Sequence, residues 1–289
     1  MNAQTLIAPR PRRVDIDLDR PGIARVYDFY LGGSEHWAID RQFGIRALAN
    51  FSQLRPIAVA NRLFLHRVVR HLIGLGVRQF VDIGAGLPTM GCTHQVADET
   101  APDSRVVYVD HEPIVVAHTQ LMLDEQGDPD RHAVCNADLR EPDQLWSRVA
   151  DTGVIDLDQP VAVLMLAVLH VRQPDRDGTD IGALAVRRYR QLMPSGSYLA
   201  ISHGTDVGVP DALADRLAGL KRLYDNHSSP LLWRTHTEIR DLFGDFTLVQ
   251  PGMTWTPTWH PEHTEPALPI PYFVAPNESA IRVGVGRKS

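Results

Sequence analysis

The chain alternates short apolar, β-rich runs with helical patterns, and this alternation restricts it to a small group of folds. Five such runs follow one another along the middle of the chain: QFVDIG, RVVYVD, HAVCNAD, PVAVLMLAVLH and GSYLAISH. Strands that alternate with helices indicate a parallel sheet covered on both faces. The runs are continuously apolar, which fits strands that are buried on both sides. The sequence therefore predicts an α/β fold.

The N-terminal part of the chain has a helical pattern instead. Residues 1–13 are polar and rich in Pro and Arg, which predicts a mobile tail. Apolar residues at helical spacing predict one helix from Ile23 to Leu31, which Gly32 and Gly33 end. The same spacing predicts a longer helix from about Pro56 to Leu75.

The last part of the chain adds a short helix and two strands. Thr235 followed by Glu238 is a capping-box pattern, and FTLVQ and IRVGVG predict strands. The loop between these strands, residues 252–276, is long enough to be functional or mobile. Together the segments predict this organisation: a mobile tail at 1–13 and a single domain at 14–289, with a helical cap at 14–76 and an α/β core at 77–289.

Composition excludes several classes of protein. The 289 residues carry a formal charge of −6, which gives no electrostatic footprint for a nucleic-acid partner. Because Cys92 and Cys135 are the only cysteines, a disulfide scaffold is excluded. The longest apolar run, Val161–Leu169, is far shorter than the ~20 residues of a membrane-spanning helix. The charged N-terminal stretch also lacks the apolar run of a secretory signal, so we expect a cytoplasmic protein with no membrane partner.

A glycine turn after the first strand carries the most specific chemical signal. Asp82 precedes Gly84-Ala85-Gly86, and glycine at such a turn lets a ligand approach the backbone closely. Ligands of open parallel sheets bind beyond the carboxyl ends of the strands. Asp110 closes the second strand and can accept both ribose hydroxyls of a nucleoside. This ordered set predicts a nucleoside-cofactor site, although a glycine motif alone also fits an ordinary α/β turn.

Two nucleoside cofactors compete for such a site. A dinucleotide site requires G-x-G-x-x-G, whereas Thr89 stands where the third Gly or Ala would be. The negative charge of Asp82 would be unfavourable near the pyrophosphate of a dinucleotide. The same charge suits the positive amino group of S-adenosylmethionine. After the third strand, Asp138 can accept a hydrogen bond from the adenine amine, and Leu139 can pack against the adenine ring. An equally good interpretation is that Asp138 is an N-cap or loop residue at the start of the next helix. The residues favour S-adenosylmethionine and leave a nicotinamide cofactor as an alternative.

Motifs along nearly the whole chain, about residues 14 to 289, resemble one protein family. The matching segments are RPGIARVYDFYLGG, AIDR, ANRLFLHRVVRHL, VDIGAGLPT, VVYVDHEP, ADLREP, VLMLAVLH, GSYLAISHGT, RTHTEIRDLFGDFTLVQPGM and GVGRK. They resemble class I S-adenosylmethionine-dependent methyltransferases. More narrowly, they are similar to the actinobacterial S-adenosyl methyltransferase family, also called DUF574.

The resemblance implies a Rossmann-like sheet of seven mostly parallel strands, with an antiparallel last strand and an N-terminal helical cap. It implies an S-adenosylmethionine pocket formed by Asp82, Gly84, Ala85, Gly86, Asp110, His111, Asp138 and Leu139. It also implies that the cap folds over this pocket with Arg25, Tyr27, Asp28, Gly32, Gly33, Asn61 and Arg62. Relatives often follow Leu-Gly-Gly with Lys-Asp-Asn and an aromatic residue. This chain has Ser34-Glu35-His36-Trp37 there, so no role is carried over to those positions.

Histidines near the expected cofactor edge are candidates for the chemistry. An acceptor hydroxyl or acidic carbon has to lose a proton, and His is the usual base. His170, predicted to close the fourth strand, is the candidate catalytic base; a backbone hydrogen bond at the strand end is the alternative. His203 is a second candidate. The 13 histidines form no metal-ligand pattern, so we expect no metal. Trp255 and Trp259 either line an acceptor pocket or hold the long loop against the sheet.

The sequence thus predicts an S-adenosylmethionine-dependent methyltransferase that acts on an unidentified small molecule. Positioning of the acceptor and exclusion of water would dominate the chemistry, because a sulfonium is already an activated methyl donor. A non-catalytic S-adenosylmethionine sensor or partner-binding protein is the alternative from another class. The strand that ends in LHVR lacks the signature of enzymes that methylate base amino groups, which disfavours a nucleic-acid acceptor. The sequence leaves the oligomeric state open.

Overall fold

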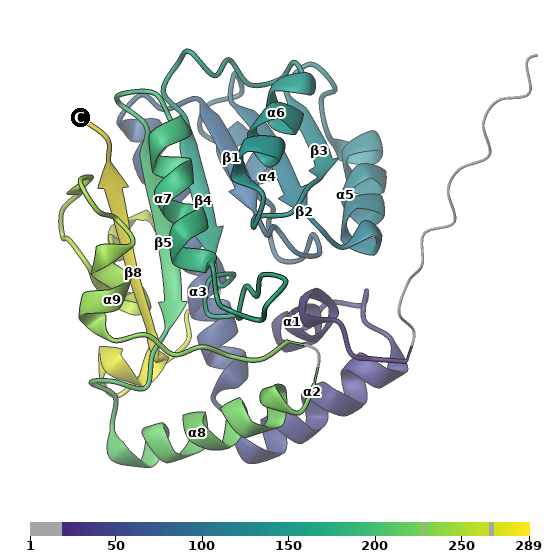
Figure 1. The fold of residues 1–289 in the computed structure, drawn as a ribbon, viewed down its shortest axis with the longest axis vertical. Coiled ribbons are helices and arrows are strands. Elements are labelled where there is room, and N and C mark those ends of the chain that lie inside the picture. The colour runs from purple at the N-terminus through teal and green to yellow at the C-terminus, as the bar shows by residue number, and fades with distance from the viewer. Residues whose placement is uncertain (1–18, 228, 266–268) are drawn as a thin grey trace, which may run out of the picture.

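The computed structural model describes residues 19–227, 229–265 and 269–289, so the tail predicted at 1–13 lies outside the described residues. The strands form one eight-stranded sheet in the order β3-β2-β1-β4-β5-β8-β6, with β7 paired to β8 (Figure 1). These strands are β1 (Gln79–Ile83), β2 (Arg105–Asp110), β3 (His132–Asn136), β4 (Ala162–Leu166), β5 (Tyr198–Gly204), β6 (Thr247–Leu248), β7 (Thr254–Trp255) and β8 (Ile281–Arg287).

The direction of the strands confirms the predicted mostly parallel sheet with an antiparallel last strand. Strands β1 to β5 are parallel to one another, and β8 runs antiparallel to β5, β6 and β7. The predicted number of seven strands is too low, because β7 lies inside the segment expected to be a loop and its two residues give no periodic signal. Since β1 lies between β2 and β4, the strand order reverses there, and a crevice is expected beyond their carboxyl ends.

Helices cover both faces of the sheet and its carboxyl edge (Figure 1). They are α1 (Ile23–Leu31), α2 (Ala38–Asn50), α3 (Leu54–Gly74), α4 (Thr93–Asp98), α5 (Pro113–Gln126), α6 (Pro142–Asp151), α7 (Gly182–Leu192), α8 (Asp211–Asp225) and α9 (His236–Asp241). Helix α1 has the predicted bounds, and Thr235 caps α9 by accepting from the amide of Glu238. Helix α2 has no predicted counterpart, because its charged and apolar residues do not separate into an apolar stripe. Among these described helices, none is both long and apolar enough to cross a membrane.

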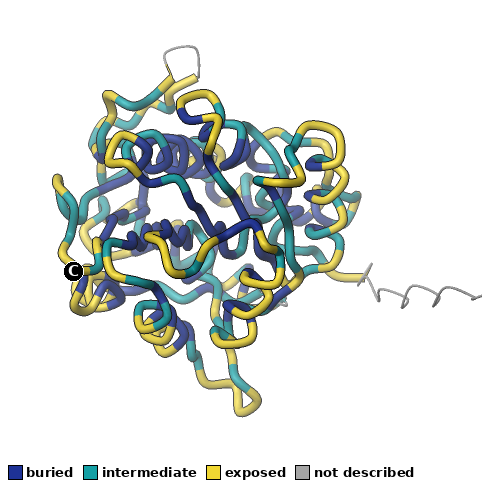
Figure 2. Tube along the Cα trace, turned by 90° about the horizontal axis from the view of Figure 1, so that it is seen from above, coloured by how far each residue is buried: buried dark blue, intermediate teal, exposed yellow. Residues whose placement is uncertain are grey.

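Alternation along the buried strands divides the core between the two faces of the sheet. In β1, Val81 and Ile83 belong to the core on the side of α6 and α7, whereas Phe80 belongs to the core on the α3 side. The same period of two turns the side chain of Asp82 toward the α3 and α4 side. Figure 2 shows buried segments running through the centre of the molecule, with exposed segments in the loops and turns that surround them and lie in front of them.

A buried ion pair holds the N-terminal helices together. Asp40 of α2 accepts hydrogen bonds from Arg25 Nε at 2.8 Å and from the amides of Gly22 and Trp37 at 2.9 and 2.8 Å. Arg25 also stacks on the Trp37 ring, 4.1 Å from its centroid. Helix α3 packs on β4 and β8 as well as on α1, so it joins these helices to the sheet. The division of the domain at residue 76 stays a prediction.

Candidate functional site

A continuous cavity of about 210 Å³ lies at the carboxyl ends of β1, β2 and β4, beneath α1, α3 and α8. A water molecule needs only about 10–15 Å³, so this space can hold an organic ligand. One end, here called the polar end, is lined by the glycine turn and by Arg62, Asp82, Asp110 and Glu112. The other, called the apolar end, is lined by Tyr30, Phe51, Leu217, Leu220, Tyr224, Leu231 and Trp233 with His170.

Backbone conformation explains why glycine occupies two positions of the turn. Gly84 and Gly86 have φ angles of 71° and 67°, in the left-handed region that other residues rarely adopt. The Gly84 amide donates to Val109 O at 2.8 Å, which ties the turn to β2. A Cβ at Gly84 would lie 2.6 Å from Val168 Cγ2, whereas a Cβ at Gly86 would meet no atom within 4 Å. The helix expected directly after the turn begins only at Thr93, so the turn opens into a loop.

This difference predicts unequal effects for two matched alanine substitutions. Both Gly84→Ala and Gly86→Ala place a side chain at positive φ, which costs about 1–2 kcal/mol. Only Gly84→Ala adds the clash with Val168, so we expect it to lower the free energy of unfolding by roughly 1 kcal/mol more than Gly86→Ala. Urea unfolding of both variants measures the difference. Equal losses would show that Val168 moves away freely.

Two buried carboxylates close β1 and β2. Asp110 accepts from the Gly86 amide at 3.1 Å and from the Glu112 amide at 2.9 Å. Asp82 accepts from Thr93 Oγ1 at 2.7 Å. Burial raises the pKa of Asp82 and of Asp110, because desolvation disfavours the charged carboxylate. Because burial disfavours the charged form of both carboxylates, the pair favours a ligand that brings positive charge or several hydrogen-bond donors.

Helix α3 brings a cation and an amide to the same end of the cavity. Arg62 is only 7% exposed, and its charge lowers the pKa of Asp82 without a hydrogen bond between them. Among the described residues, the structure gives the Arg62 guanidinium no hydrogen-bond or ion-pair partner. Asn61 donates from Nδ2 to the Tyr27 hydroxyl at 3.0 Å, while its buried Oδ1 has no partner in the described chain. The positive charge of Arg62 could bind the carboxylate of an α-amino acid group. Asn61 Oδ1 and Asp82 could accept hydrogen bonds from its ammonium group.

His170 does not close β4 as predicted. The strand ends at Leu166, and Ala167 adopts a left-handed φ of 57°, so the chain turns out of the sheet before it reaches His170. The imidazole still lines the cavity. Its Nδ1 accepts from the Gly204 amide at 3.2 Å, and burial lowers its pKa to about 4. The backbone contact that sequence analysis gave as the alternative is therefore present.

The sequence of the whole chain matches a known family. A family model described as S-adenosyl methyltransferase matches residues 9–289. The chain belongs to the S-adenosyl methyltransferase family. It is similar to a crystal structure of a proposed methyltransferase from Thermobifida fusca, with 34% identity, a TM-score of 0.80, and coverage of 94% of this chain and 97% of that one. It is also similar to a DUF574 family protein from Streptomyces avermitilis, with 32% identity, a TM-score of 0.82, and coverage of 94% and 99%. No curated protein matches the chain.

Membership in this methyltransferase family confirms the family, the enzyme class and the cofactor expected from the sequence. The nicotinamide alternative is wrong. The chemistry of the polar end fits S-adenosylmethionine: Asp82 and Asp110 are buried acids, and among the described residues Asn61 Oδ1 and the Arg62 guanidinium have no partner. Gly84 and Gly86 leave room for close approach of the ligand to the turn.

Most of the predicted cofactor residues of this methyltransferase line the cavity. Those that do are Tyr27, Asn61, Asp82, Gly84, Ala85, Gly86, Asp110, His111 and Leu139. Arg25 does not, because its guanidinium is used by Asp40. Gly32 and Gly33 lie outside the cavity too; a Cβ at Gly33 would collide with the Asp28 carboxylate, so Gly33 serves the fold of the cap. Asp138 also lies outside the lining, where Arg140 binds its carboxylate and lowers its pKa.

Other residues weighed from the sequence have structural roles. His203 is fully buried behind His170, where Nδ1 contacts Gly204 O at 2.7 Å and Nε2 contacts Arg234 at 2.7 Å. Trp259 packs on Phe64 of α3, and Trp255 stacks on Arg282, so both hold the long loop against the body of the methyltransferase.

A histidine cluster outside the cavity escaped sequence analysis because its members are far apart in the chain. His71, His260 and His263 bring ligand atoms within 4.8 Å of one another. However, the rings of His71 and His260 are stacked at 4.1 Å, which sets their lone pairs side by side instead of toward one ion. His260 also uses both nitrogens, on Glu262 and on Gln250 O. We therefore assign this cluster to packing between the loop and α3.

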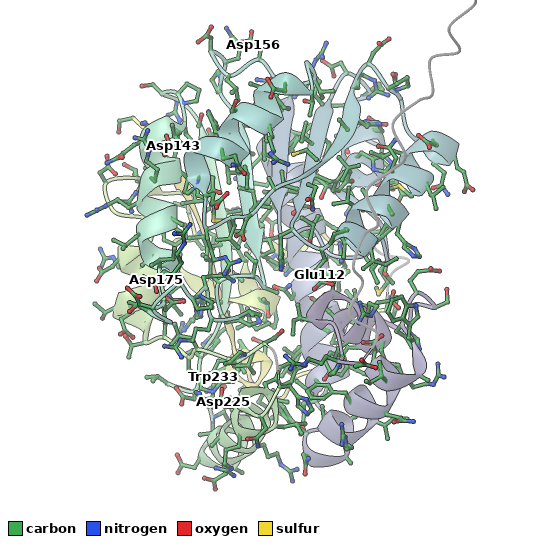
Figure 3. The ribbon with its side chains drawn as sticks, turned by 45° about the vertical axis from the view of Figure 1, so that its right-hand side comes forward. Glu112, Asp143, Asp156, Asp175, Asp225 and Trp233 are labelled. Atoms are coloured by element: carbon green, nitrogen blue, oxygen red, sulfur yellow. The ribbon has the colours of Figure 1, made fainter. Side chains whose placement is uncertain are left out.

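The apolar end is the part of the site that sequence analysis missed. Apart from Phe51 and His170, its side chains come from α1, from α8 and from the segment after α8, including Trp233 (Figure 3). The Tyr30 and Tyr224 hydroxyls are 3.0 Å apart and satisfy one another across this end. No local motif marks these residues, since an apolar helix face looks the same whether it covers a core or a cavity.

Proposed function

We propose that the polar end of the cavity binds S-adenosylmethionine and that the apolar end binds a small, largely apolar methyl acceptor. The observation that carries this proposal is the continuity of the cavity from the glycine turn to Trp233 and α8. Cap helix α1 and helix α8 contribute to the same walls, so a bound acceptor would be shielded from water. A macromolecular acceptor is disfavoured, because its reacting group would have to enter a cavity covered by these helices.

Each polar residue has a role that follows from its contacts. Asp110, whose carboxylate closes β2, accepts the ribose hydroxyls, while Leu139 contacts the adenine ring. Asp82 and Asn61 Oδ1 accept from the ammonium group, and Arg62 binds the carboxylate. When bound, S-adenosylmethionine supplies a methyl group already activated on a sulfonium. The protein's contribution is to orient the two reactants and to exclude water.

Turnover and acceptor class can be tested together. Purified protein is incubated with S-adenosylmethionine and panels of apolar small molecules, peptides and oligonucleotides, and the release of S-adenosylhomocysteine is measured. We expect release with members of the small-molecule panel only. Release with peptides or oligonucleotides alone would contradict the proposed acceptor. Tight cofactor binding without release in any panel would instead support the non-catalytic sensor.

The assignment of Arg62 predicts a loss that depends on the ligand. Arg62→Gln should weaken binding of S-adenosylhomocysteine by about tenfold, because a hydrogen-bonded charge pair is lost. The same variant should bind 5′-methylthioadenosine normally, since this nucleoside has no amino acid group. Calorimetric titration of both ligands measures the contrast, and Arg62→Lys should retain part of the affinity. Equal losses for the two ligands would place Arg62 away from the carboxylate.

A further inference from the structure

The proton of the His170 ring is fixed on one nitrogen by the backbone of β5. Because β4 has ended at Leu166, the Gly204 amide finds no strand partner there and donates to His170 Nδ1 at 3.2 Å instead. A ring nitrogen that accepts from a backbone N–H carries no proton of its own. The neutral imidazole therefore has its proton on Nε2, for which the described residues provide no partner.

Neighbouring side chains hold His170 in this orientation. Arg234 donates to Leu169 O at 2.7 Å and binds Asp180 at 2.8 Å, which anchors the turn that carries the histidine. The Trp233 ring lies 6.4 Å from the His170 ring, and it is so close to Gly204 that a Cβ there would approach it to 2.6 Å. A flip of the imidazole would leave the Gly204 amide without its acceptor.

The surrounding charges keep the ring neutral. Burial, together with the smaller effect of the positive charge of Arg234, lowers the pKa of His170 to about 4. His203 packs against the ring at 5.8 Å and is itself neutral near pH 7, since burial lowers its pKa to about 3. With its one lone pair used by Gly204, His170 cannot take a proton from a substrate. It can only donate a hydrogen bond from Nε2.

The apolar end offers no other base among its described residues. The Tyr30 and Tyr224 hydroxyls bind each other, and burial raises the pKa of both. The side-chain amide of Gln173 donates to Val168 O and Val171 O. The carboxylates that line the cavity belong to the polar end. An acceptor that must lose a proton during the reaction would find no group here to receive it.

We propose that His170 donates a hydrogen bond from Nε2 to the methyl acceptor, and that this acceptor is a largely apolar molecule with an oxygen already ionised at neutral pH, such as a carboxylate or an acidic enolate. This rests on the proposed function, because it takes the apolar end as the acceptor site. A lone pair of the ionised oxygen forms the new O–C bond as the C–S bond breaks. The oxygen anion and the sulfonium become a neutral methyl ester or ether and a neutral thioether, and no proton leaves.

The protonation of His170 can be measured without knowledge of the acceptor. Nitrogen-15 NMR of the histidine-labelled protein with S-adenosylhomocysteine should show one ring that is absent from His170→Gln. We expect its Nδ1 to be unprotonated, its Nε2 to be protonated, and neither signal to titrate between about pH 5.5 and 8. A proton on Nδ1, or a titration in that range, would overturn the proposal that His170 donates a hydrogen bond from Nε2. It would support a role for His170 as the catalytic base instead.

A pair of probes with the same ring system tests the acceptor class. With S-adenosylhomocysteine bound, 2-naphthoate should bind the protein about tenfold tighter than 2-naphthylmethanol, because only the first brings an ionised oxygen. His170→Leu should abolish this preference and His170→Gln should retain part of it. His236→Leu, at an exposed position of α9, should leave it intact.

Equal binding of the two probes, or no binding of the naphthoate, would overturn the proposed acceptor. Failure of S-adenosylhomocysteine itself to bind would instead contradict the assigned cofactor site. The two failures are measured in separate titrations, so they remain distinguishable. A preference that survives in His170→Leu would show that another group recognises the anion.

Discussion

Replacing Asp110 with alanine is expected to weaken binding of S-adenosylhomocysteine by about 100-fold. The carboxylate can accept both ribose hydroxyls, and hydrogen bonds to a charged group contribute about 1.5–3 kcal/mol each. Unlike Arg62→Gln, this change should also weaken 5′-methylthioadenosine, because both ligands contain the ribose. Calorimetry on both ligands measures the effect, and Asp124→Ala, at an exposed position of α5, serves as the control. Unchanged affinity would show that the ribose lies elsewhere.

Although the Asp110 carboxylate is expected to strengthen ligand binding, its ionisation is expected to destabilise the ligand-free protein. Burial raises the pKa of Asp110 above its ordinary 3.8, so the folded protein holds this proton more tightly than the unfolded chain. The contribution of Asp110 to the stability of the ligand-free protein should therefore fall as the pH rises above 3.8 and through the folded pKa. Asp110→Asn cannot ionise and should reduce this dependence while leaving Tm at pH 7 unchanged or raised. Thermal unfolding across this pH range checks it; a lower Tm at pH 7 would contradict the direction.

The polar end was predictable because its signal is local in the sequence. The glycine turn, Asp82 and Asp110 each sit where a strand ends, and parallel strands bring their carboxyl ends to one edge of the sheet. The same reasoning predicted the alternation of β1 to β5 with helices, but it gave no counterpart for α2. It could not give β7, whose two residues are defined only by their pairing with β8.

Residue type alone could not decide which charges meet a ligand. Arg25 looked like a cofactor residue, yet its partner is Asp40, 15 positions later in a helix that has no apolar stripe. Arg62, on a helix with a clear pattern, lines the cavity and has no hydrogen-bond or ion-pair partner among the residues that the structure describes. His170 illustrates a further limit: a left-handed residue, Ala167, ends the strand inside a continuous apolar run. Only the three-dimensional structure separates these cases.

Breaking the ion pair in the N-terminal helices is expected to have the largest effect on stability. In Arg25→Met, the carboxylate of Asp40 would remain fully buried with its cation gone, which costs about 3–5 kcal/mol. The loss should exceed that of Arg41→Met, an equal change at an exposed position of the same α2 helix that holds Asp40. Urea unfolding followed by circular dichroism measures both variants.

The double variant Arg25→Met/Asp40→Asn separates the pair from the packing around it. If Arg25→Met destabilises the protein because the buried carboxylate of Asp40 has lost its cation, then Asp40→Asn should recover part of the lost stability. The effects of the two substitutions would then be less than additive. Because Tyr27 and Tyr30 lie on the helix that Arg25 anchors, hydrogen exchange in α1 should rise in Arg25→Met and fall back in the double variant. Additive losses would mean that Arg25 stabilises the cap through its stacking on Trp37 and not through its charge.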